Sequence, residues 1–391
     1  MTASNILIIG AGIGGLTSAL AFAQNGRDVD IVEQAPTLSE VGAGLQVSPN
    51  ASRILIALGL GEPLRANLIL PQEITLASGR SLRRITHVPC GAFAADRWGA
   101  PYGVMHRADL QGLLLDAVLA HPRCRLHLGQ RISTLDIKTL HERFEQQCPG
   151  LIIGADGVWS QTRNLIPDAP GPRFSGQVAW RFKVAADVAR NVLNPFNVTA
   201  FLGSRTHLVA YPLENGKTFN MVAITAGTDP GQTWAENVRP ADRLELLNAF
   251  SGWHPGLVSI LRNAPEMTWW PLFGVPNGRW HNADRTVLIG DAAHAMTPFA
   301  AQGAAMAIED GYELAQAVTQ TTGDITGTLE RYETRRRARI ARARSRGAFN
   351  KFAYHARGPI RFGRDLVLAL KSPESLAADL DWLYGYRASG L

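Results

Sequence analysis

One stretch near the amino end limits the possible folds of this chain more than any other. Residues 6–33 (ILIIGAGIGGLTSALAFAQNGRDVDIVE) read as a short apolar strand, a glycine-rich turn, a helix that runs to Gln24, and a second strand. Gly10, Gly12 and Gly15 fit the pattern G-x-G-x-x-G, whose glycines permit a tight turn, the approach of a pyrophosphate, and close packing of helix on strand. The stretch therefore predicts a Rossmann-like dinucleotide site.

The acid after the second strand supports this interpretation. Glu33 follows Gly15 by eighteen residues, about where the ribose-binding acid of the motif belongs. The backbone at Ala11 would face phosphate at the amino end of the helix, where unpaired N–H groups favour negative charge. The alternative for residues 6–23 is an apolar helix or a membrane span. Four glycines in six positions would begin a helix poorly, however, and no basic segment precedes them.

Length and cysteine usage point to an ordinary globular protein in a reducing compartment. A chain of 391 residues with 46% hydrophobic and 18% charged residues is long enough for two or three domains. Its cysteines, Cys90, Cys124 and Cys148, are odd in number and form no C-x-x-C pair. This pattern argues against a disulfide framework, a zinc site or a thiol redox centre, and it favours a cytoplasmic protein without a bound metal.

The positive charge of the chain is local. Residues 335–346 hold seven arginines and no acid, so that a net charge of +6 leaves 6 − 7 = −1 for the rest of the chain. We interpret this run as a solvated helix whose arginine stems cover apolar neighbours. A site for an anionic partner is the alternative. We expect no nucleic-acid and no membrane partner, and either a monomer or a homodimer.

The periodicity of the chain changes near Gly176. Period-two runs indicate strands at 177–184, 197–202, 206–213 and 217–225, and short turns between them predict an antiparallel sheet. Parallel-strand character returns near residue 285, and helical patterns dominate from Ala300. We therefore expect a discontinuous nucleotide-binding domain (1–175 and 276–391) interrupted by the sheet (176–275).

A second informative stretch runs from Asp284 to Gly311 (DRTVLIGDAAHAMTPFAAQGAAMAIEDG). A buried strand delivers Asp291 at its end, and a helix rich in alanine and glycine begins after Pro298. A carboxylate beside a helix amino terminus suits a polyol and an anionic ring edge. NAD offers no obvious use for this late site, whereas FAD has a ribitol chain and a flavin ring.

Three spaced motifs in order resemble those of the class A flavoprotein monooxygenases, the single-component aromatic hydroxylases. Residues 10–15 resemble their FAD fingerprint, residues 154–157 (GADG) their DG motif, and residues 290–303 their GD motif, while residues 106–110 (HRADL) are similar to their H-R-x-D-L. The resemblance implies an α/β fold with a Rossmann-like FAD-binding domain, an inserted antiparallel β-sheet substrate domain and a helical C-terminal region.

Carried over to this chain, the resemblance also implies the residues that bind the cofactor. The adenosine ribose would be bound by Glu33, the ribitol by Asp291, and the flavin pyrimidine by the backbone at Gly303 and Ala304. Asp156 would serve both FAD and the docking of NAD(P)H, and Arg107 would reach FAD. A turn residue is the alternative role for Asp156, and a helix cap is the alternative for Asp291.

Residues of the predicted sheet carry the substrate hypothesis. Period two places His207, Val209 and Tyr211 on one face of the strand THLVAYP. This spacing resembles the histidine and tyrosine of family members that act on 3-hydroxybenzoate and 6-hydroxynicotinate. We expect His207 to be a general base, because histidine titrates near physiological pH, and Tyr211 to orient the substrate. A structural histidine is the alternative.

The remaining predicted site residues come from the flavin-facing loops. The resemblance assigns Pro298 to the catalytic site, and Gln46 and Phe299, together with Val209, to substrate binding.

The implied activity is an FAD-dependent monooxygenation of a small phenolic or hydroxybenzoate-like ring, with O2 and NADH or NADPH, through a flavin C4a-hydroperoxide. The alternatives are an epoxidase or N-hydroxylase on the same fold, or a catalytically inactive flavin-binding interaction protein.

Overall fold

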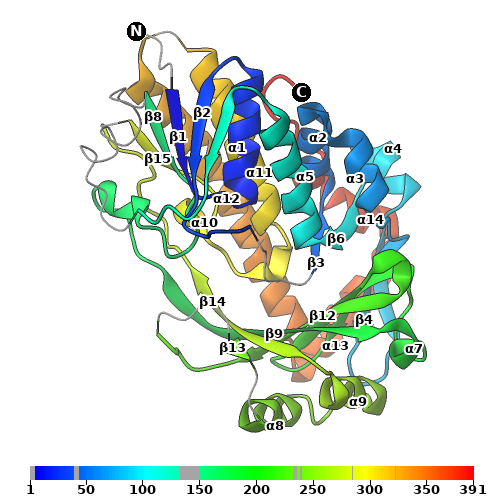
Figure 1. Ribbon diagram of the computed structural model, residues 1–391. Coiled ribbons are helices and arrows are strands. Elements are labelled where there is room, and N and C mark those ends of the chain that lie inside the picture. Colours follow the sequence, from blue (N-terminus) through cyan, green and yellow to red (C-terminus); the bar gives the residue numbers. More distant parts are fainter. Residues whose placement is uncertain are drawn as a thin grey trace.

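A computed structural model describes residues 5–38, 44–132, 150–231, 236–237, 240–283, 285–321 and 323–391. The chain forms two main sheets, and in Figure 1 the parallel sheet with its helices lies above the larger second sheet. Cys90 and Cys124 are free thiols, and Cys148 lies outside the described residues. None of the helices in these ranges is long and apolar enough to cross a membrane.

The first sheet has five parallel strands in the order β15-β8-β1-β2-β7. They are β1 (Asn5–Ile9), β2 (Asp28–Val32), β7 (Cys124–His127), β8 (Leu151–Gly154) and β15 (Thr286–Leu288). The strand order reverses at β1, so the carboxyl ends of β1 and β8 border the crevice in which such sheets bind ligands. The Rossmann-like domain predicted from residues 6–33 is confirmed.

Glycines let the elements around this sheet approach closely. The turn after β1 has Gly10 at φ +106°, a conformation that a side chain disfavours. A Cβ on Gly15 would lie 1.9 Å from the Gly10 carbonyl oxygen, so only glycine lets α1 (Ile13–Gln24) begin here. One layer of helices, α1, α5 (Arg107–Ala120) and α11 (Gly303–Thr319), packs in the same core as the sheet.

The second sheet has eight strands in the order β13-β14-β9-β12-β11-β10-β4-β5. Four of them confirm the predicted period-two runs: β9 (Arg173–Ala185), β10 (Asn197–Leu202), β11 (His207–Leu213) and β12 (Thr218–Ala226). The others are β4 (Glu73–Ser78), β5 (Arg84–Pro89), β13 (Glu236–Asn237) and β14 (Met267–Gly274).

The sheet differs in two respects from the one expected. The hairpin β4–β5 comes from the chain before residue 176, and β4 pairs with β10 in parallel. The sheet is therefore mixed, although its other described pairs are antiparallel. The physical reason is that β10 would otherwise expose an unpaired edge, which the hairpin covers.

The two faces of this sheet have different partners. One face packs against α8 (Pro240–Ala249) and α9 (Pro255–Asn263) through aromatic and aliphatic side chains such as Trp180, Phe219 and Leu257. Because side chains alternate along a strand, the opposite face carries His207, Val209 and Tyr211 of β11. In Figure 1 α8 and α9 lie below the sheet and the parallel domain lies above it.

Shorter elements complete the chain between the longer strands and helices. They are the two-stranded sheet of β3 (Gly44–Val47) and β6 (Gly103–His106), with α2 (Pro49–Leu55), η1 (Ile56–Leu60), α3 (Gly61–Asn67), α4 (Ala92–Trp98), η2 (Thr162–Leu165), α7 (Ala186–Ala189), η3 (Glu214–Gly216), α10 (Asp291–His294) and η4 (Pro298–Ala300).

One long helix joins both domains. The 30 residues of α12 (Ile325–Tyr354) span about 45 Å at 1.5 Å per residue. Its Tyr332 packs in the core of the parallel sheet, Ile340 in a middle cluster, and Tyr354 against the second sheet. The chain then ends in α13 (Gly358–Leu370), α14 (Pro373–Ala378) and α15 (Asp381–Tyr384).

We predict that the crossing of α1 and α11 tolerates no side chain at Gly311. A Cβ there would lie 2.5 Å from Ser18 Oγ and 2.9 Å from Ser18 N, so Gly311→Ala should lower the free energy of unfolding by about 1–3 kcal/mol. The control is Gly112→Ala in α5, where a Cβ meets no atom within 4 Å and the change should stabilise by about 0.5–1 kcal/mol. Urea unfolding compares the two; equal effects would contradict the close helix crossing.

Candidate cofactor and substrate site

Four candidate residues lie at one edge of the parallel sheet. Gly10 follows β1, Glu33 follows β2, Asp156 follows β8 and Asp291 follows β15. The carboxyl ends of parallel strands share one edge, which is where open α/β sheets bind nucleotides. The pairing of these strands therefore brings together signals that are up to 281 positions apart in the sequence, from 10 to 291.

The glycine turn fits a pyrophosphate. Gly12 precedes the first residue of α1 and no side chain caps this helix, so its first N–H groups are available to an anion. A Cβ on Gly12 would meet no atom within 4 Å, which leaves the backbone open. Glu33 lies against the turn, because its carboxylate accepts hydrogen bonds from the N–H of Ala11 (2.8 Å) and of Ala35 (2.9 Å).

The amino end of α11 offers a second open backbone. Gln302 precedes the helix without capping it, and a Cβ on Gly303 would meet no atom within 4 Å. Asp291 is exposed in the first turn of α10, and its carboxylate makes no hydrogen bond to any residue that the structure describes. An anionic ring edge and a polyol fit these groups, so the donors and acceptors present suit FAD.

Asp156 has a local structural role. Its carboxylate accepts hydrogen bonds from Ser160 Oγ (2.6 Å), Gln161 N (2.8 Å), Thr162 N (2.9 Å) and Thr162 Oγ1 (3.0 Å). These bonds hold the turn that leads into η2. The roles predicted for Asp156 in binding FAD and docking NAD(P)H stay predictions, as does that of Arg107 at the start of α5.

His207 is buried against the loop that precedes α11. His207 is only 3% exposed, and its ring centroid lies 5.0 Å from that of Phe299 in η4. Its Nδ1 lies 2.9 Å from Nε2 of His355, the residue after α12. Burial, and then the neighbouring His355, hold the pKa of His207 well below its usual 6.5. The imidazole is therefore neutral near pH 7, with an N–H on one ring nitrogen and a lone pair on the other.

Tyr211 lies at the other end of the same strand face. Its side chain is buried against β3, where a Cβ on Gly44 would lie 2.6 Å from the tyrosine Cε2, and burial raises its pKa. Gln46, which like Gly44 belongs to β3, accepts a hydrogen bond from Tyr102 Oη at 2.6 Å. The structure thus joins His207 to Phe299 and Tyr211 to the strand of Gln46, with Val209 between them.

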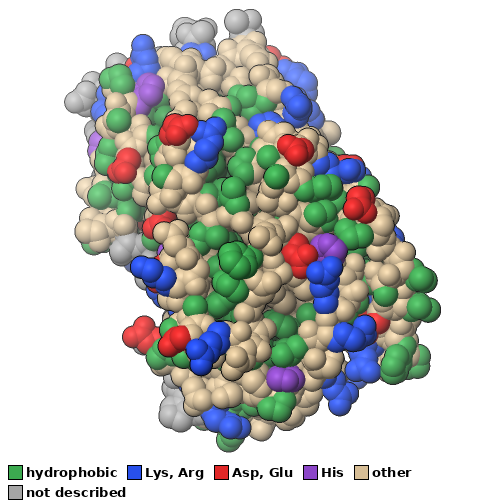
Figure 2. All heavy atoms as spheres, turned by 90° about the vertical axis from the view of Figure 1, so that its right-hand side faces the viewer, with side chains coloured by type: hydrophobic (Ala, Val, Ile, Leu, Met, Phe, Trp, Pro, Cys, Tyr) green, Lys and Arg blue, Asp and Glu red, His purple; other side chains and the backbone are tan. Residues whose placement is uncertain are grey.

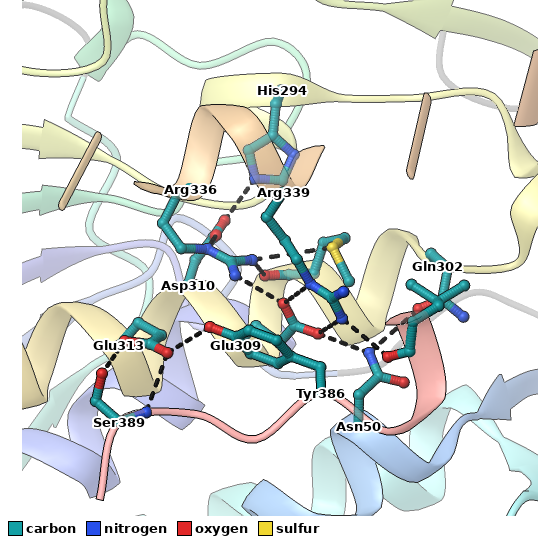
Figure 3. Close-up of polar contacts among 12 residues, drawn as sticks. Asn50, His294, Gln302, Glu309, Asp310, Glu313, Arg336, Arg339, Tyr386 and Ser389 are labelled. Atoms are coloured by element: carbon teal, nitrogen blue, oxygen red, sulfur yellow. Dashed lines mark hydrogen bonds and ion pairs between the residues drawn. The ribbon is translucent and has the colours of Figure 1, made fainter. Parts of the chain in front are cut away.

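A buried ionic cluster lies behind the carboxyl edge of the parallel sheet (Figure 3). Arg336 of α12 donates to Asp310 Oδ1 (Nε, 2.7 Å) and to Glu309 Oε2 (NH1, 2.7 Å) of α11, and all three side chains are at most 2% exposed. Asp310 also accepts from Gly290 N (2.9 Å) and His294 Nε2 (2.5 Å). The cluster therefore fixes the turn that presents Asp291.

The charges of the cluster keep its acids ionised. Burial raises the pKa of Asp310, but the charges of His294 and Arg336 and their hydrogen bonds outweigh burial, and the net pKa is lowered. Burial also raises the pKa of Glu309, but Arg336 and Arg339 outweigh burial, and the net pKa of Glu309 is lowered as well. Both side chains are therefore carboxylates at neutral pH, and each depends on its arginine partner.

Glu309 connects the cluster to the segment that precedes α11. Its Oε1 accepts from Arg339 NH2 (2.7 Å) and from Asn50 Nδ2 (2.7 Å), and Asn50 Nδ2 lies 3.3 Å from Gln302 Oε1. In Figure 3 the Asn50 and Gln302 side chains point toward each other beside Glu309. The segment before Gly303 is thus held by the same carboxylate pair that holds the turn before Asp291.

The prediction of a solvated arginine helix is wrong for Arg336 and Arg339. These side chains are 2% and 9% exposed, because the adjacent acids of α11 compensate their charge. The signal was present in the sequence: Glu309 and Asp310 stand together directly after the apolar run 303–308. On the face shown in Figure 2, the described Lys and Arg side chains are scattered among acidic and apolar ones and form no continuous stripe.

Sequence reasoning missed two residues that bond to a predicted site residue or to a residue of the GD motif. His355 bonds to His207, and Asn50 bonds to Gln302. Neither belongs to a motif, and only the fold brings them to the site.

Comparison with known proteins places these features in a family. The FAD binding domain family matches residues 3–346. The 3-hydroxybenzoate 6-hydroxylase of Klebsiella oxytoca is 32% identical over 97% of this chain and 96% of its own length. Salicylate hydroxylase of Pseudomonas putida is 31% identical over 97% and 92%. Klebsiella pneumoniae HpxO, solved with FAD and uric acid, has the same fold, with a TM-score of 0.80, 23% identity and coverage of 97% and 96%.

We predict that the cluster stabilises the fold only as a complete set. Arg336→Met would leave two buried carboxylates short of a cation and should lower the free energy of unfolding by about 3–5 kcal/mol at pH 7. The loss should shrink at lower pH, because protonation relieves the unpaired acids. The control is Arg342→Met, where an exposed guanidinium lies 4.2 Å from the Trp382 ring centroid; it should cost less than about 1 kcal/mol. Equal losses in urea unfolding at pH 7 would contradict the role of the cluster.

Proposed function

Because this chain belongs to the FAD binding domain family and, within it, to the flavoprotein aromatic hydroxylases, we propose that it hydroxylates a small phenolic or hydroxybenzoate-like ring with O2 and NADH or NADPH. The names of its relatives, 3-hydroxybenzoate 6-hydroxylase and salicylate hydroxylase, support this substrate class. The observation that carries the proposal is the packing of His207 against Phe299. Their ring centroids are 5.0 Å apart, and they join the second sheet to the segment that leads to Gly303.

The cofactor would be held by the open backbones and carboxylates of the sheet edge. Gly12 and the adjoining Ala11, whose N–H is bound to Glu33, would line the pyrophosphate site. Glu33 would bind the adenosine ribose and Asp291 the ribitol. Gly303 with the adjoining Ala304 would face the flavin pyrimidine. When bound, FAD accepts reducing equivalents from NAD(P)H and activates O2, chemistry that side chains lack.

The protein's own residues would prepare the substrate. His207, neutral because it is buried, would accept the phenolic proton at Nε2, and the resulting phenolate ring is more electron-rich and more nucleophilic. Tyr211 would orient the other end of the ring. Val209 and Phe299 would supply apolar walls, and the exclusion of water protects reactive species from side reactions.

The first prediction concerns FAD itself. The purified protein should be yellow, and Asp291→Ala should weaken FAD binding by about 5- to 150-fold, because an unsatisfied polar group costs about 1–3 kcal/mol. The control is Asp116→Ala, an exposed acid of α5. Titration of the apoprotein with FAD and the absorbance of the acid supernatant measure both. A colourless protein that FAD does not reconstitute would refute the proposed cofactor.

A second prediction separates substrate activation from flavin reduction. His207→Ala should retain FAD and still be reduced by NAD(P)H, but hydroxylation of 3-hydroxybenzoate or salicylate should fall by about 10²- to 10⁴-fold, the usual contribution of a general base. NAD(P)H should then be consumed with release of hydrogen peroxide instead of product. His121→Gln, in the first domain, is the control. A tightly coupled His207→Ala enzyme at the wild-type rate would leave His207 a structural histidine.

A further inference from the structure

The buried position of His207 creates a need for a proton exit. The residue is 3% exposed, so a proton that it accepts has no direct contact with bulk water. Its Nδ1 is 2.9 Å from His355 Nε2, and its Nε2 makes no hydrogen bond within the part of the chain that the structure describes. One ring nitrogen is therefore committed to His355 and the other is available to a ligand.

His355 lies between this buried ring and the surface. It is partly exposed and ends α12, and its carbonyl oxygen accepts from Arg205 N (3.4 Å) in the turn between β10 and β11. Its ring centroid is 5.1 Å from that of His207 and 5.5 Å from that of Phe299. The imidazole is thus fixed to the substrate sheet by both its backbone and its side chain, and it also reaches solvent.

The bond between the two rings can carry a proton. Burial, followed by the charge of Lys351, lowers the pKa of His355 to about 4, so both imidazoles are neutral near pH 7. A hydrogen bond between neutral imidazoles needs one N–H and one lone pair. When His207 carries its proton on Nδ1, its Nε2 is a base and His355 Nε2 is the acceptor.

The groups around His355 favour this neutral state. Lys351, one turn earlier on α12, lowers its pKa, and the Tyr354 hydroxyl has its own pKa raised by burial. From α13, Arg364 donates to the Ala353 carbonyl (2.7 Å) and is paired with Asp365 (2.6 Å). Among the described residues no carboxylate forms an ion pair with either imidazole, so no neighbouring anion holds an extra proton on the two rings at neutral pH.

We propose that His355 is the solvent-side member of a two-imidazole proton relay that serves His207. The inference rests on the proposed function, since it supplies the path for the phenolic proton. In the forward direction the substrate O–H bond breaks and a bond to His207 Nε2 forms. The Nδ1 proton of His207 passes to His355 Nε2, and the Nδ1 proton of His355 passes to water.

The reverse sequence restores the starting tautomers. After hydroxylation the phenolate oxygen of the product takes a proton from His207 Nε2. His207 Nδ1 recovers a proton from His355 Nε2, and His355 Nδ1 recovers one from water. The relay therefore neither gains nor loses protons or electrons over one turnover, and it needs no further reactant. His355 acts through His207 and is a positioning and relay residue, not a group that touches the substrate.

A test that needs no substrate follows the ring protons directly. In the FAD-loaded protein with ¹⁵N-labelled histidine, NMR measures how fast the His207 ring N–H exchanges with water. His355→Gln keeps a hydrogen-bonding group beside His207 but cannot pass a proton, so exchange should slow by about 10-fold or more. His121→Gln should exchange as the wild type does. Wild-type exchange in His355→Gln would overturn the relay.

The second arm measures turnover with 3-hydroxybenzoate or salicylate. His355→Gln should lower kcat by about 10- to 100-fold, within the range of acid–base contributions, with KM and the rate of flavin reduction unchanged. Added imidazole should restore part of the rate. A loss of FAD content or a rise in KM without a fall in kcat would instead mark a structural role and overturn the relay.

Lys351→Gln gives an independent variant that keeps both histidines. Removing the cation should raise the pKa of His355 above about 4. The acidic limb of the pH profile of kcat should therefore move to higher pH, and the NMR titration of His355 should move with it. An unmoved pH limb would contradict the relay. If no phenol is hydroxylated but exchange still depends on His355, the proposed substrate class fails while the relay stands.

Discussion

The pairing of Arg336 with Glu309 and Asp310 is the interaction on which the rest of the site depends. Three charged side chains at most 2% exposed would be strongly destabilising if any were unpaired. Their mutual hydrogen bonds offset the cost of burying the charges and also fix the orientation of each side chain. Asp310 fixes the turn before Asp291 through Gly290 and His294, and Glu309 fixes the start of α11 through Asn50.

The helix α12 connects this cluster, at the carboxyl edge of the parallel sheet, with the second sheet. Its Arg336 belongs to the ionic cluster, and its end at His355 bonds to His207 of β11. Between them the helix passes η4, where Asn350 donates to the Phe299 carbonyl (2.9 Å). One helix therefore sets the position of Phe299 and His355 relative to the turns at the carboxyl edge of the parallel sheet.

Two buried histidines have different hydrogen-bond partners. His294 donates to the carboxylate of Asp310, an acceptor that cannot return a proton to it while ionised, so this bond is a fixed brace. His207 faces another neutral imidazole, and either ring can donate. The same side chain thus braces the turn before Asp291 in one domain and contacts a second imidazole in the other.

The sequence alone determined the parts of this protein that depend on local geometry. Glycine spacing at 10, 12 and 15 predicted the nucleotide turn because only glycine permits φ +106° at Gly10 and the contact of Gly15 with its carbonyl. Period two placed His207 and Tyr211 on one strand face. The contacts of Arg336 with α11, of His355 with His207 and of β4 with β10 were decided only by tertiary structure. The residues that they join are 26 or 27, 148 and 124 positions apart, respectively. No local pattern encodes which distant partner will neutralise a charge, cover a strand edge or share a proton.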